Sequence, residues 1–490
     1  MLGDCSRRER QMLLGTTNKG GTVTESKTEA TTSTVTNKDG STTETKQETT
    51  TTSTGSKTES TTVTTVNKDG SSTATTIATT TDKAGTVTES KTESTTNKNG
   101  TTKETTSTTE TKANGTVTES KTETTINKDG SSKATTTETV TKADGTKVES
   151  KTTATTSLST NKTTGTVTET KKETTTTSDG VKSEGTTVTQ IQKDGTVTSK
   201  ETVKASDSTG TTATKTTILD AKGNVTTAAE AVVSAKAVTE ATKTGGAVTI
   251  PLDVTATKSA STAPTVSVSV PKAAESVRVE LPVQNVTPGT VAVIVNADGT
   301  EKIVSTSMVT ENGVALTLDG SATVKLVDNS KSFKDVPNTN VFYNEISSLS
   351  AREIMIGKTG DKFDLHNSVT LNQIANVAGR IIGAVDVKNF NAGVAWGQTG
   401  GLKTGNVSAT RGDVLKALYI AAGSPAVEDT GILARFKDSA SIPADMTAIA
   451  AWAAQNGILK GNTDGAAGLS KYVSRGQACA LAGRTMGTLA

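Results

Sequence analysis

Few residues of this chain carry side chains suited to catalysis or metal binding. His366 is the only histidine among 490 residues, and Cys5 and Cys479 are the only cysteines. A catalytic triad built on histidine would have to use His366, and no nucleophile motif stands near it. Two cysteines at opposite ends of the chain indicate neither a disulfide framework nor a metal cluster. We therefore expect a protein that is not an enzyme and uses no cofactor or metal, with His366 on the surface or in a loop.

Charge and hydropathy narrow the classes of partner. The chain has 52 basic and 50 acidic residues and a formal net charge of +2, which gives no reason to expect nucleic acid as a partner. No apolar run approaches the ~20 residues of a transmembrane helix, so we expect no transmembrane segment. All aromatic residues lie between Phe333 and Tyr472. The chain therefore contains at least two kinds of sequence.

The N-terminal segment, MLGDCSRRERQMLLG, differs in composition from the rest of the chain. A signal peptide needs an apolar core of ~7–15 residues, and this segment carries charge instead. We leave residues 1–15 unassigned and expect the visible start to be truncated or misassigned.

Residues 16–225 form a repeat rich in Thr, Lys and Glu. A glycine recurs at every fifteenth position from Gly40 to Gly145 and again from Gly165 to Gly210. The sequence NKDG or NKNG ends at every second glycine of the first series, and such a segment is typical of a type I turn closed by a left-handed glycine. Because threonine is β-branched and favours strands, the repeat predicts antiparallel β-hairpins. They would form a long meander, one sheet thick.

The two faces of such a strand differ in residues 116–126. Val117, Glu119, Lys121 and Glu123 lie on one face, and hydroxyl residues lie on the other. We expect ladder hydrogen bonds, Thr–Thr pairs and cross-strand Glu–Lys pairs to hold the sheet. Two alternatives remain open. One is a disordered or glycosylated stalk, since the composition is also typical of disorder. The other is a Thr-x-Thr solenoid, which the absence of an inward apolar row disfavours.

Two segments come after the repeat. Residues 226–246 predict a linker helix with a capping box of Thr227 and Glu230, ended by two glycines. Residues 247–330 contain short alternating runs separated by turn signals, which predict a small all-β domain. This domain shows no reactive cluster, and we expect it to act as a packing or spacer module.

Residues 331–490 have helical periodicity and three similar helix starts. In each, a hydroxyl residue is followed three positions later by a polar or acidic one, the pattern of a capping box that satisfies free N–H groups. Three capped helices predict an all-α domain of three degenerate repeats, about 331–385, 386–430 and 431–490. The pairs are Thr370 and Gln373, Thr410 and Asp413, and Ser474 and Gln477.

The repeat text resembles S-layer homology domains of Gram-positive (Firmicutes-type) surface proteins. FKDVP (333–337) and FKDS (436–439) are similar to the opening of those domains, and AAWAAQNGILKGNTDG (450–465) is similar to their core. TRGD (410–413) and SRGQ (474–477) are similar to their Thr-Arg-Ala-Glu motif, whereas Leu371 replaces the arginine in the first copy. The resemblance covers about a third of the chain.

The resemblance implies a compact helical prism that binds secondary cell-wall polysaccharide, often carrying ketal pyruvate, without a covalent bond. A guanidinium just after a helix N-cap suits a carboxylate ligand, because the helix start already favours an anion. By position, the resemblance implies six polysaccharide-binding residues: the clamp arginines Arg411 and Arg475, and Asp335, Asp438, Trp396 and Trp452.

The expected function is that of a non-enzymatic, extracellular cell-wall protein. Its C-terminal repeats would anchor it to the wall, and its Thr-rich repeat would project as a stalk or S-layer-like coat, with self-association within that layer. The alternative is an adhesin whose repeat binds ligands on a host or neighbouring cell. The repeat lacks aromatic residues, which leaves few anchors for tight binding.

Overall fold

The computed structural model describes residues 5–17, 23–53, 55–284, 286–358 and 361–489. The chain forms two compact units, one of Met1–Ser208 with Thr214–Thr227 and one of Thr209–Ala213 with Ala228–Ala490. Each unit has its own architecture.

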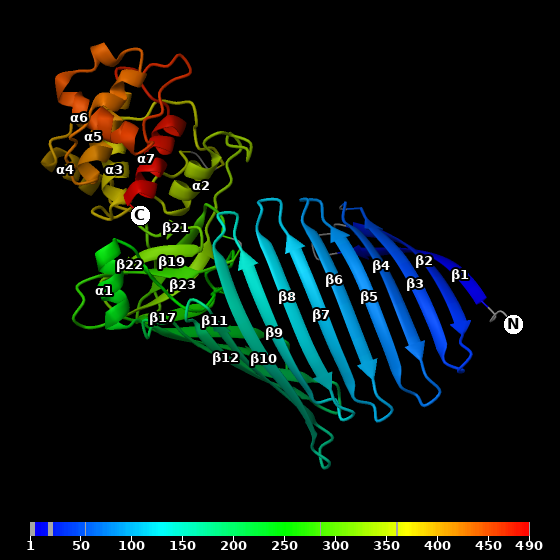
Figure 1. Ribbon diagram of the computed structural model, residues 1–490. Coiled ribbons are helices and arrows are strands. Elements are labelled where there is room, and N and C mark those ends of the chain that lie inside the picture. The colour runs from blue at the N-terminus through cyan, green and yellow to red at the C-terminus, as the bar shows by residue number, and fades with distance from the viewer. Residues whose placement is uncertain (1–4, 18–22, 54, 285, 359–360, 490) are drawn as a thin grey trace. The chain divides into compact units, whose positions relative to one another are not determined.

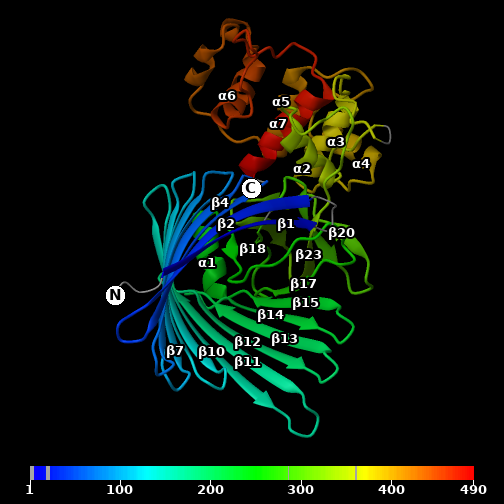
Figure 2. The same cartoon turned by 90° about the vertical axis from the view of Figure 1, so that its right-hand side faces the viewer.

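The first unit is an antiparallel meander of long strands. From β1 to β13 each strand pairs with the next in the chain, so the ribbons lie side by side in chain order (Figures 1 and 2). The ordered meander is confirmed, and the disordered stalk and the solenoid are not observed. The strands are β1 Cys5–Thr17, β2 Val23–Thr36, β3 Thr42–Thr52, β4 Lys57–Val66, β5 Ser72–Thr81, β6 Val87–Thr96, β7 Thr102–Thr111, β8 Val117–Ile126, β9 Ser132–Thr141, β10 Lys147–Thr160, β11 Val167–Thr177, β12 Lys182–Ile191 and β13 Val197–Ser206, followed by β14 Thr212–Leu219 and β15 Val225–Val232.

The turns explain the spacing of the glycines. After β2, the Gly40 N–H donates to the Asn37 carbonyl at 2.9 Å, and the Asn37 N–H donates to the Ser41 carbonyl at 2.8 Å. Asp39 Oδ1 accepts from the N–H and the hydroxyl of Ser41 at 2.9 and 2.7 Å. Gly40 has a φ of +78°, and the later repeat glycines through Gly210 share this left-handed conformation, which glycine adopts without steric cost. The predicted turn chemistry is confirmed.

One face of the meander, here the hydroxyl face, carries a continuous row of threonines across β4–β11. Their hydroxyls bond in four successive pairs at 2.7–3.0 Å. The predicted Thr–Thr pairs are therefore confirmed. The row consists of Thr62, Thr76, Thr92, Thr106, Thr122, Thr136, Thr152 and Thr175.

The opposite face, here the charged face, carries lysines and glutamates on alternate strands. Lys91 pairs with Glu93 at 2.8 Å, and Lys121 pairs with Glu123 at 2.7 Å, each within one strand. The prediction of cross-strand Glu–Lys pairs is wrong at these positions, because the register places Ser107 opposite both Lys91 and Lys121. The nearest strand with the same charge pattern lies two strand spacings away, about 10 Å.

The second unit begins with two small sheets that share one apolar core, which includes Val268, Leu281, Leu316 and Leu326. One sheet has the order β15–β17–β23–β19–β20, and the other has the order β16–β18–β22–β21. The alternating runs of residues 247–330 are the strands of this two-sheet body. Their bounds are β16 Val248–Thr249, β17 Thr265–Ser269, β18 Val277–Pro282, β19 Thr290–Val295, β20 Glu301–Ile303, β21 Met308–Val309, β22 Gly313–Leu318 and β23 Ala322–Asp328.

The predicted linker helix over 226–246, capped by Thr227 and Glu230, is wrong in its first half. Val225–Val232 is strand β15, whose C-terminal part pairs in parallel with β17. Ala231 is buried and Glu230 exposed, the alternation of a strand. Helix α1 spans only Ala235–Thr244 and is capped by Ser234. Pairing with the sheet outweighs the helix propensity of the alanines.

Helices make up the rest of the second unit, around a core that includes Leu349, Phe363, Leu415 and Trp452. The expected C-terminal helices are confirmed (Figure 1). Their bounds are α2 Tyr343–Ala351, α3 Leu371–Ile381, α4 Phe390–Thr399, α5 Arg411–Ala421, α6 Thr447–Gln455 and α7 Arg475–Leu489, with short 3-10 turns at Gly431–Arg435, Ser439–Ser441 and Ala444–Met446.

A buried arginine connects these helices to the two-sheet body. Arg352, which follows α2, has no exposed surface. Its Nε donates to the Ser307 carbonyl, and its Nη atoms donate to the carbonyls of Pro288, Thr290 and Ser348. Burial lowers the pKa of Arg352 to about 10.

Candidate functional site

The three capped helix starts lie together in the second unit. In each, the N-cap hydroxyl accepts from the N–H three residues on, and that residue's side chain accepts from the N-cap N–H. All three predicted capping boxes are therefore confirmed. The segments before the helices also form β-bridges with one another, so each segment contacts the other two. The bridges are Ser368 with Ser474, Thr370 with Ser408, and Thr410 with Tyr472.

Arg475, at the start of α7, reaches into the loop that is held by Asp335. Its guanidinium donates to the carbonyls of Phe363 at 2.9 Å and Ile356 at 2.6 Å, and it stacks 4.9 Å from the Phe363 ring centre. Arg475 is 6% exposed, and burial lowers its pKa. We expected the Arg475 guanidinium to bind a ligand carboxylate, but its hydrogen bonds go to backbone carbonyls.

Asp335 holds the same loop from the other side. Its carboxylate accepts from the N–H groups of Phe363, Asp364 and Leu365 at 2.8–2.9 Å. Burial alone would raise the pKa of Asp335, but these N–H donors hold it below its usual value. The structure thus gives Asp335 a loop-fixing position, and the same loop is contacted by Arg475, which lies far from Asp335 in the chain.

Arg411, at the start of α5, makes the equivalent contact with the loop of Asp438. The Asp438 carboxylate accepts from the N–H groups of Ala467 and Gly468 at 2.7 and 2.9 Å, and Arg411 Nη1 donates to the Ala467 carbonyl at 2.7 Å. Backbone donors again lower the pKa of Asp438 although burial opposes them. Arg411 is only half-buried and borders a cavity, so part of its guanidinium remains available.

The two predicted tryptophans pack into the helical body. Trp452, on α6, is 5% exposed and lies edge-to-face against Tyr419, with ring centres 5.4 Å apart. Trp396, on α4, is half-buried and packs against the same core. Trp452 therefore offers no face to a sugar, and its prediction as a stacking residue is corrected to a core role.

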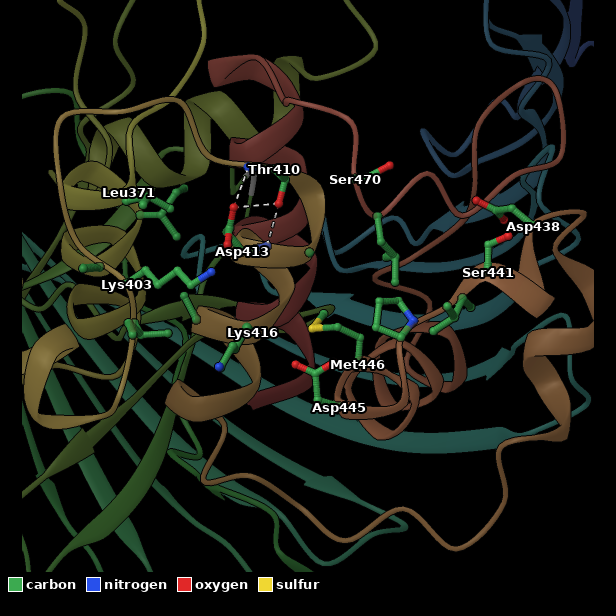
Figure 3. A pocket seen from close by; sticks show the side chains of 18 residues that line it. Leu371, Lys403, Thr410, Asp413, Lys416, Asp438, Ser441, Asp445, Met446 and Ser470 are labelled. Carbon is green, nitrogen blue, oxygen red and sulfur yellow. Dashed lines mark hydrogen bonds between the residues drawn. The ribbon is translucent and has the colours of Figure 1, made fainter.

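One cavity, here the lysine cavity, lies between α3, α5 and the segment before α6 (Figure 3). It has a volume of about 360 Å³ and an apolar wall that includes Leu371 and Met446. Its charged lining consists of Lys403 and Lys416 together with Asp413, Asp438 and Asp445. Among the described residues neither lysine has an ion-pair partner. The three carboxylates outnumber the two ammonium groups, so the lining carries no excess of positive charge.

A second cavity, here the arginine cavity, has a volume of about 480 Å³ and lies beside α7 and the loop after α6. Its lining includes Arg411, Lys460, Lys471 and Arg484, and Tyr472, whose side chain is 68% exposed. Three of these four basic groups have protein partners: Lys471 pairs with an aspartate at 3.4 Å, and Arg411 and Arg484 each donate to a carbonyl. The cavity is nevertheless predominantly basic.

Asn462 places an unused donor in the wall of the arginine cavity. Its Nδ2 atom is buried and has no hydrogen-bond partner in the described structure. A Cβ on Gly468 would lie 2.6 Å from this Nδ2 and 3.2 Å from Arg411 Nη1, so the amide and the guanidinium share one neighbourhood. Buried donors are normally satisfied. Because this Nδ2 has no exposed surface, a ligand oxygen would reach it only after the neighbouring side chains move.

The sequence does not distinguish these cavity residues from others of their kind. Lysines occur throughout the chain, no motif marks Lys403 or Lys416, and the motif that contains Lys460 gives no role to this lysine. Asn462 lies within the GNTDG segment, but only the fold shows that its amide is unpaired. His366 lies in an exposed turn, as expected.

The described ranges contain neither a cluster of metal-binding side chains nor a helix that could span a membrane. No three His, Cys, Asp or Glu side chains are grouped there to hold a metal ion. No helix in the described part of the chain has the length and apolar character needed to cross a membrane.

No protein-family model matches the chain, and no curated protein shows significant similarity to it.

Proposed function

We propose that this is a non-enzymatic extracellular protein whose C-terminal helices bind an acidic cell-wall polysaccharide without a covalent bond. The arginine cavity is the observation that carries this proposal. It combines an excess of positive charge, an unsatisfied amide donor at Asn462 and an exposed aromatic ring at Tyr472. Guanidinium and amide donors suit carboxylate and hydroxyl oxygens, and an aromatic ring suits the apolar face of a sugar.

Two features of the helical part support the resemblance to S-layer homology domains. The three N-cap segments bridge one another in a closed set of three, as three related repeats would. The Arg–Asp loop contact occurs twice, once between the third and first copies and once between the second and third. The first copy has Leu371 in place of the arginine.

On this proposal the meander projects from the wall as a stalk or coat. Its faces are hydroxyl and charged side chains, which favour solubility. The lysine cavity is less suited to an acidic polymer, because three carboxylates line it beside Lys403 and Lys416.

Co-sedimentation of the full chain with isolated Gram-positive cell walls tests the proposal. Asn462→Asp would place a carboxylate beside Arg411, in competition with an acidic ligand. We expect at least about tenfold weaker binding, the equivalent of one charge-assisted hydrogen bond. Lys403→Glu with Lys416→Glu tests the lysine cavity separately.

Asn391→Asp, a change of the same kind at an exposed position on α4, is the matched control and should bind like the parent chain. If Asn462→Asp also pellets like the parent, the arginine cavity is not the site. If the parent chain does not pellet and instead adheres to cells through residues 16–225, the adhesin alternative replaces the anchor.

A further inference from the structure

The meander has no apolar interior. Of the described side chains from Ser26 to Lys204, only Ser41 is buried. Each strand therefore interacts with its two neighbours and with nothing else in the sheet. The stability of such an array is a sum of nearest-neighbour terms, and it need not unfold as one block.

The order of the strands determines how tension would act on this sheet. β1 pairs only with β2, and every following strand through β13 pairs with its neighbours in the chain. A pull on the two ends of the chain is therefore applied first to an edge strand. That strand is peeled from one end, so its ladder hydrogen bonds break a few at a time.

From β4 to β10 the junctions between strands are of two kinds. Nearer the N-terminus there is no such alternation, because hydroxyl bonds cross both β2–β3, between Thr28 and Thr50, and β3–β4, between Thr43 and Thr65. Within the hairpins β4–β5, β6–β7 and β8–β9, threonine hydroxyls bond across the strands at 2.9–3.0 Å. Between these hairpins, at β5–β6, β7–β8 and β9–β10, the described side chains form no hydrogen bond or ion pair across the junction. The Lys–Glu pairs add nothing there, because each lies within one strand.

The turn geometry explains this alternation. The Asn67 N–H bonds to the Ser71 carbonyl, which sets the order of wide and narrow pairs along the β4–β5 hairpin. Thr62 and Thr76 then fall in a closely spaced, non-hydrogen-bonded pair, where opposing side chains approach most closely. Across the next junction Thr76 and Thr92 occupy the wider kind of pair. The same register recurs with every second repeat glycine, at Gly40, Gly70, Gly100 and Gly130.

We propose that the meander is an extensible tether in which strands β4–β9 are released under tension in steps of one two-stranded hairpin. Tension high enough to break a threonine-bonded junction also breaks the weaker junction behind it. Each event therefore releases both strands together. A hairpin with its two turns, roughly 30 residues, corresponds to about 100 Å of extended chain. This property goes beyond wall anchoring and does not depend on it.

Single-molecule stretching of the full chain, held by handles at its two ends, tests this proposal. We expect strands β4–β9 to lengthen in repeated hairpin steps of about 100 Å. A variant with five threonine-to-valine substitutions loses the hydroxyl bonds of the three hairpins but keeps β-branched side chains. The substitutions are Thr58→Val, Thr62→Val, Thr92→Val, Thr96→Val and Thr122→Val. In this valine variant the two kinds of junction become similar. Its steps should shorten to single strands, about 50 Å each, at lower force.

Thr64→Val with Thr124→Val is the matched control. Both threonines lie on the hydroxyl face opposite alanines, Ala74 and Ala134, and have no hydroxyl partner in the described structure. This control should keep the hairpin steps. Steps that arise from the second unit are recognised because they are the same in all three proteins.

Three results would overturn the proposal. One is release of the whole meander in a single event. Another is a parent chain that already unfolds in single-strand steps. The last is a valine variant with an unchanged step pattern, provided that its circular dichroism shows the same strand content as the parent.

Discussion

Arg352 should be the most sensitive single position in the second unit. Its guanidinium has no carboxylate partner among the described residues, and it donates to three carbonyls of the two-sheet body, those of Ser307, Pro288 and Thr290. Arg352→Met keeps most of the side-chain volume but removes every donor. The carbonyls of Ser307 and Thr290 would then be buried without a partner, and the half-buried Pro288 carbonyl would lose its donor.

The magnitude follows from two opposing terms. An unsatisfied buried polar group costs about 1–3 kcal/mol, so two buried carbonyls and one half-buried carbonyl cost about 5 kcal/mol. Burial lowers the pKa of Arg352 to about 10, a shift that corresponds to about 3 kcal/mol against burial of the charge. Replacement by methionine removes that penalty. We therefore expect a net loss of about 2 kcal/mol in the free energy of unfolding.

Urea unfolding followed by tryptophan fluorescence measures this loss. Trp396 and Trp452 are the only tryptophans and both belong to the helical part, so the signal excludes the meander. Arg435→Met is the control, because Arg435 is exposed although it also donates to a carbonyl, that of Leu459. It should cost less than about 1 kcal/mol. An Arg352→Met protein within about 0.5 kcal/mol of the parent, with an unchanged dependence on urea, would refute the reasoning.

Three further predictions concern other parts of the chain. The pKa values of Asp335 and Asp438 are lowered in the folded state, so their stabilising contribution is complete above the unfolded pKa of about 4 and is lost as the pH falls below it. The tryptophan-monitored urea midpoint should drop steeply below that pH, and Asp335→Asn with Asp438→Asn should flatten the drop; an equally steep drop in the double variant would contradict this assignment. Cys479 is fully buried, which raises the pKa of its thiol. In a Cys5→Ser variant, a thiol reagent should therefore label Cys479 only as the protein unfolds. Rapid labelling of the native protein would show instead that the core is open. Gly70 has a φ of +82°, and no atom lies near the position that a Cβ would occupy, so Gly70→Ala should cost about 1 kcal/mol of stability through backbone strain alone. Thermal melting of the meander, followed by circular dichroism, should show a smaller loss of stability for Gly70→Asn than for Gly70→Ala. An equal loss in the two variants would contradict the assignment to strain.

The meander could be predicted from the sequence because its signals are local. Turn chemistry, the left-handed glycine and the alternation of side chains all act within a few residues, and each recurs at the same interval. The position of the ion pairs could not be predicted in the same way. It depends on which residue of the neighbouring strand lies opposite each lysine, and Ser107 rather than a glutamate lies opposite Lys91 and Lys121.

The helix starts were predicted for the same reason, since a capping box spans only one helical turn. The start of α1 was not, because the alanine-rich segment before it pairs with β17, a strand that lies beyond both α1 and β16 in the chain. Tertiary pairing of this kind leaves no local trace.

The candidate site depends on longer-range contacts still. Arg475, at the start of α7, contacts the loop held by Asp335, which precedes α2 in the chain. From their positions in the motifs, both residues were expected to contact the ligand. In the fold, both instead form hydrogen bonds to backbone groups of the same loop. The unpaired amide of Asn462 and the cationic lining around it appear only when α5, α7 and the loop after α6 come together.

Binding of an acidic wall polysaccharide by the helical part can be tested by co-sedimentation of the full chain with Gram-positive cell walls before and after removal of acid-labile ketal carboxylates. We expect tight, salt-sensitive binding to the untreated walls and a loss of at least about tenfold after treatment. Equal binding to both preparations would contradict this expectation.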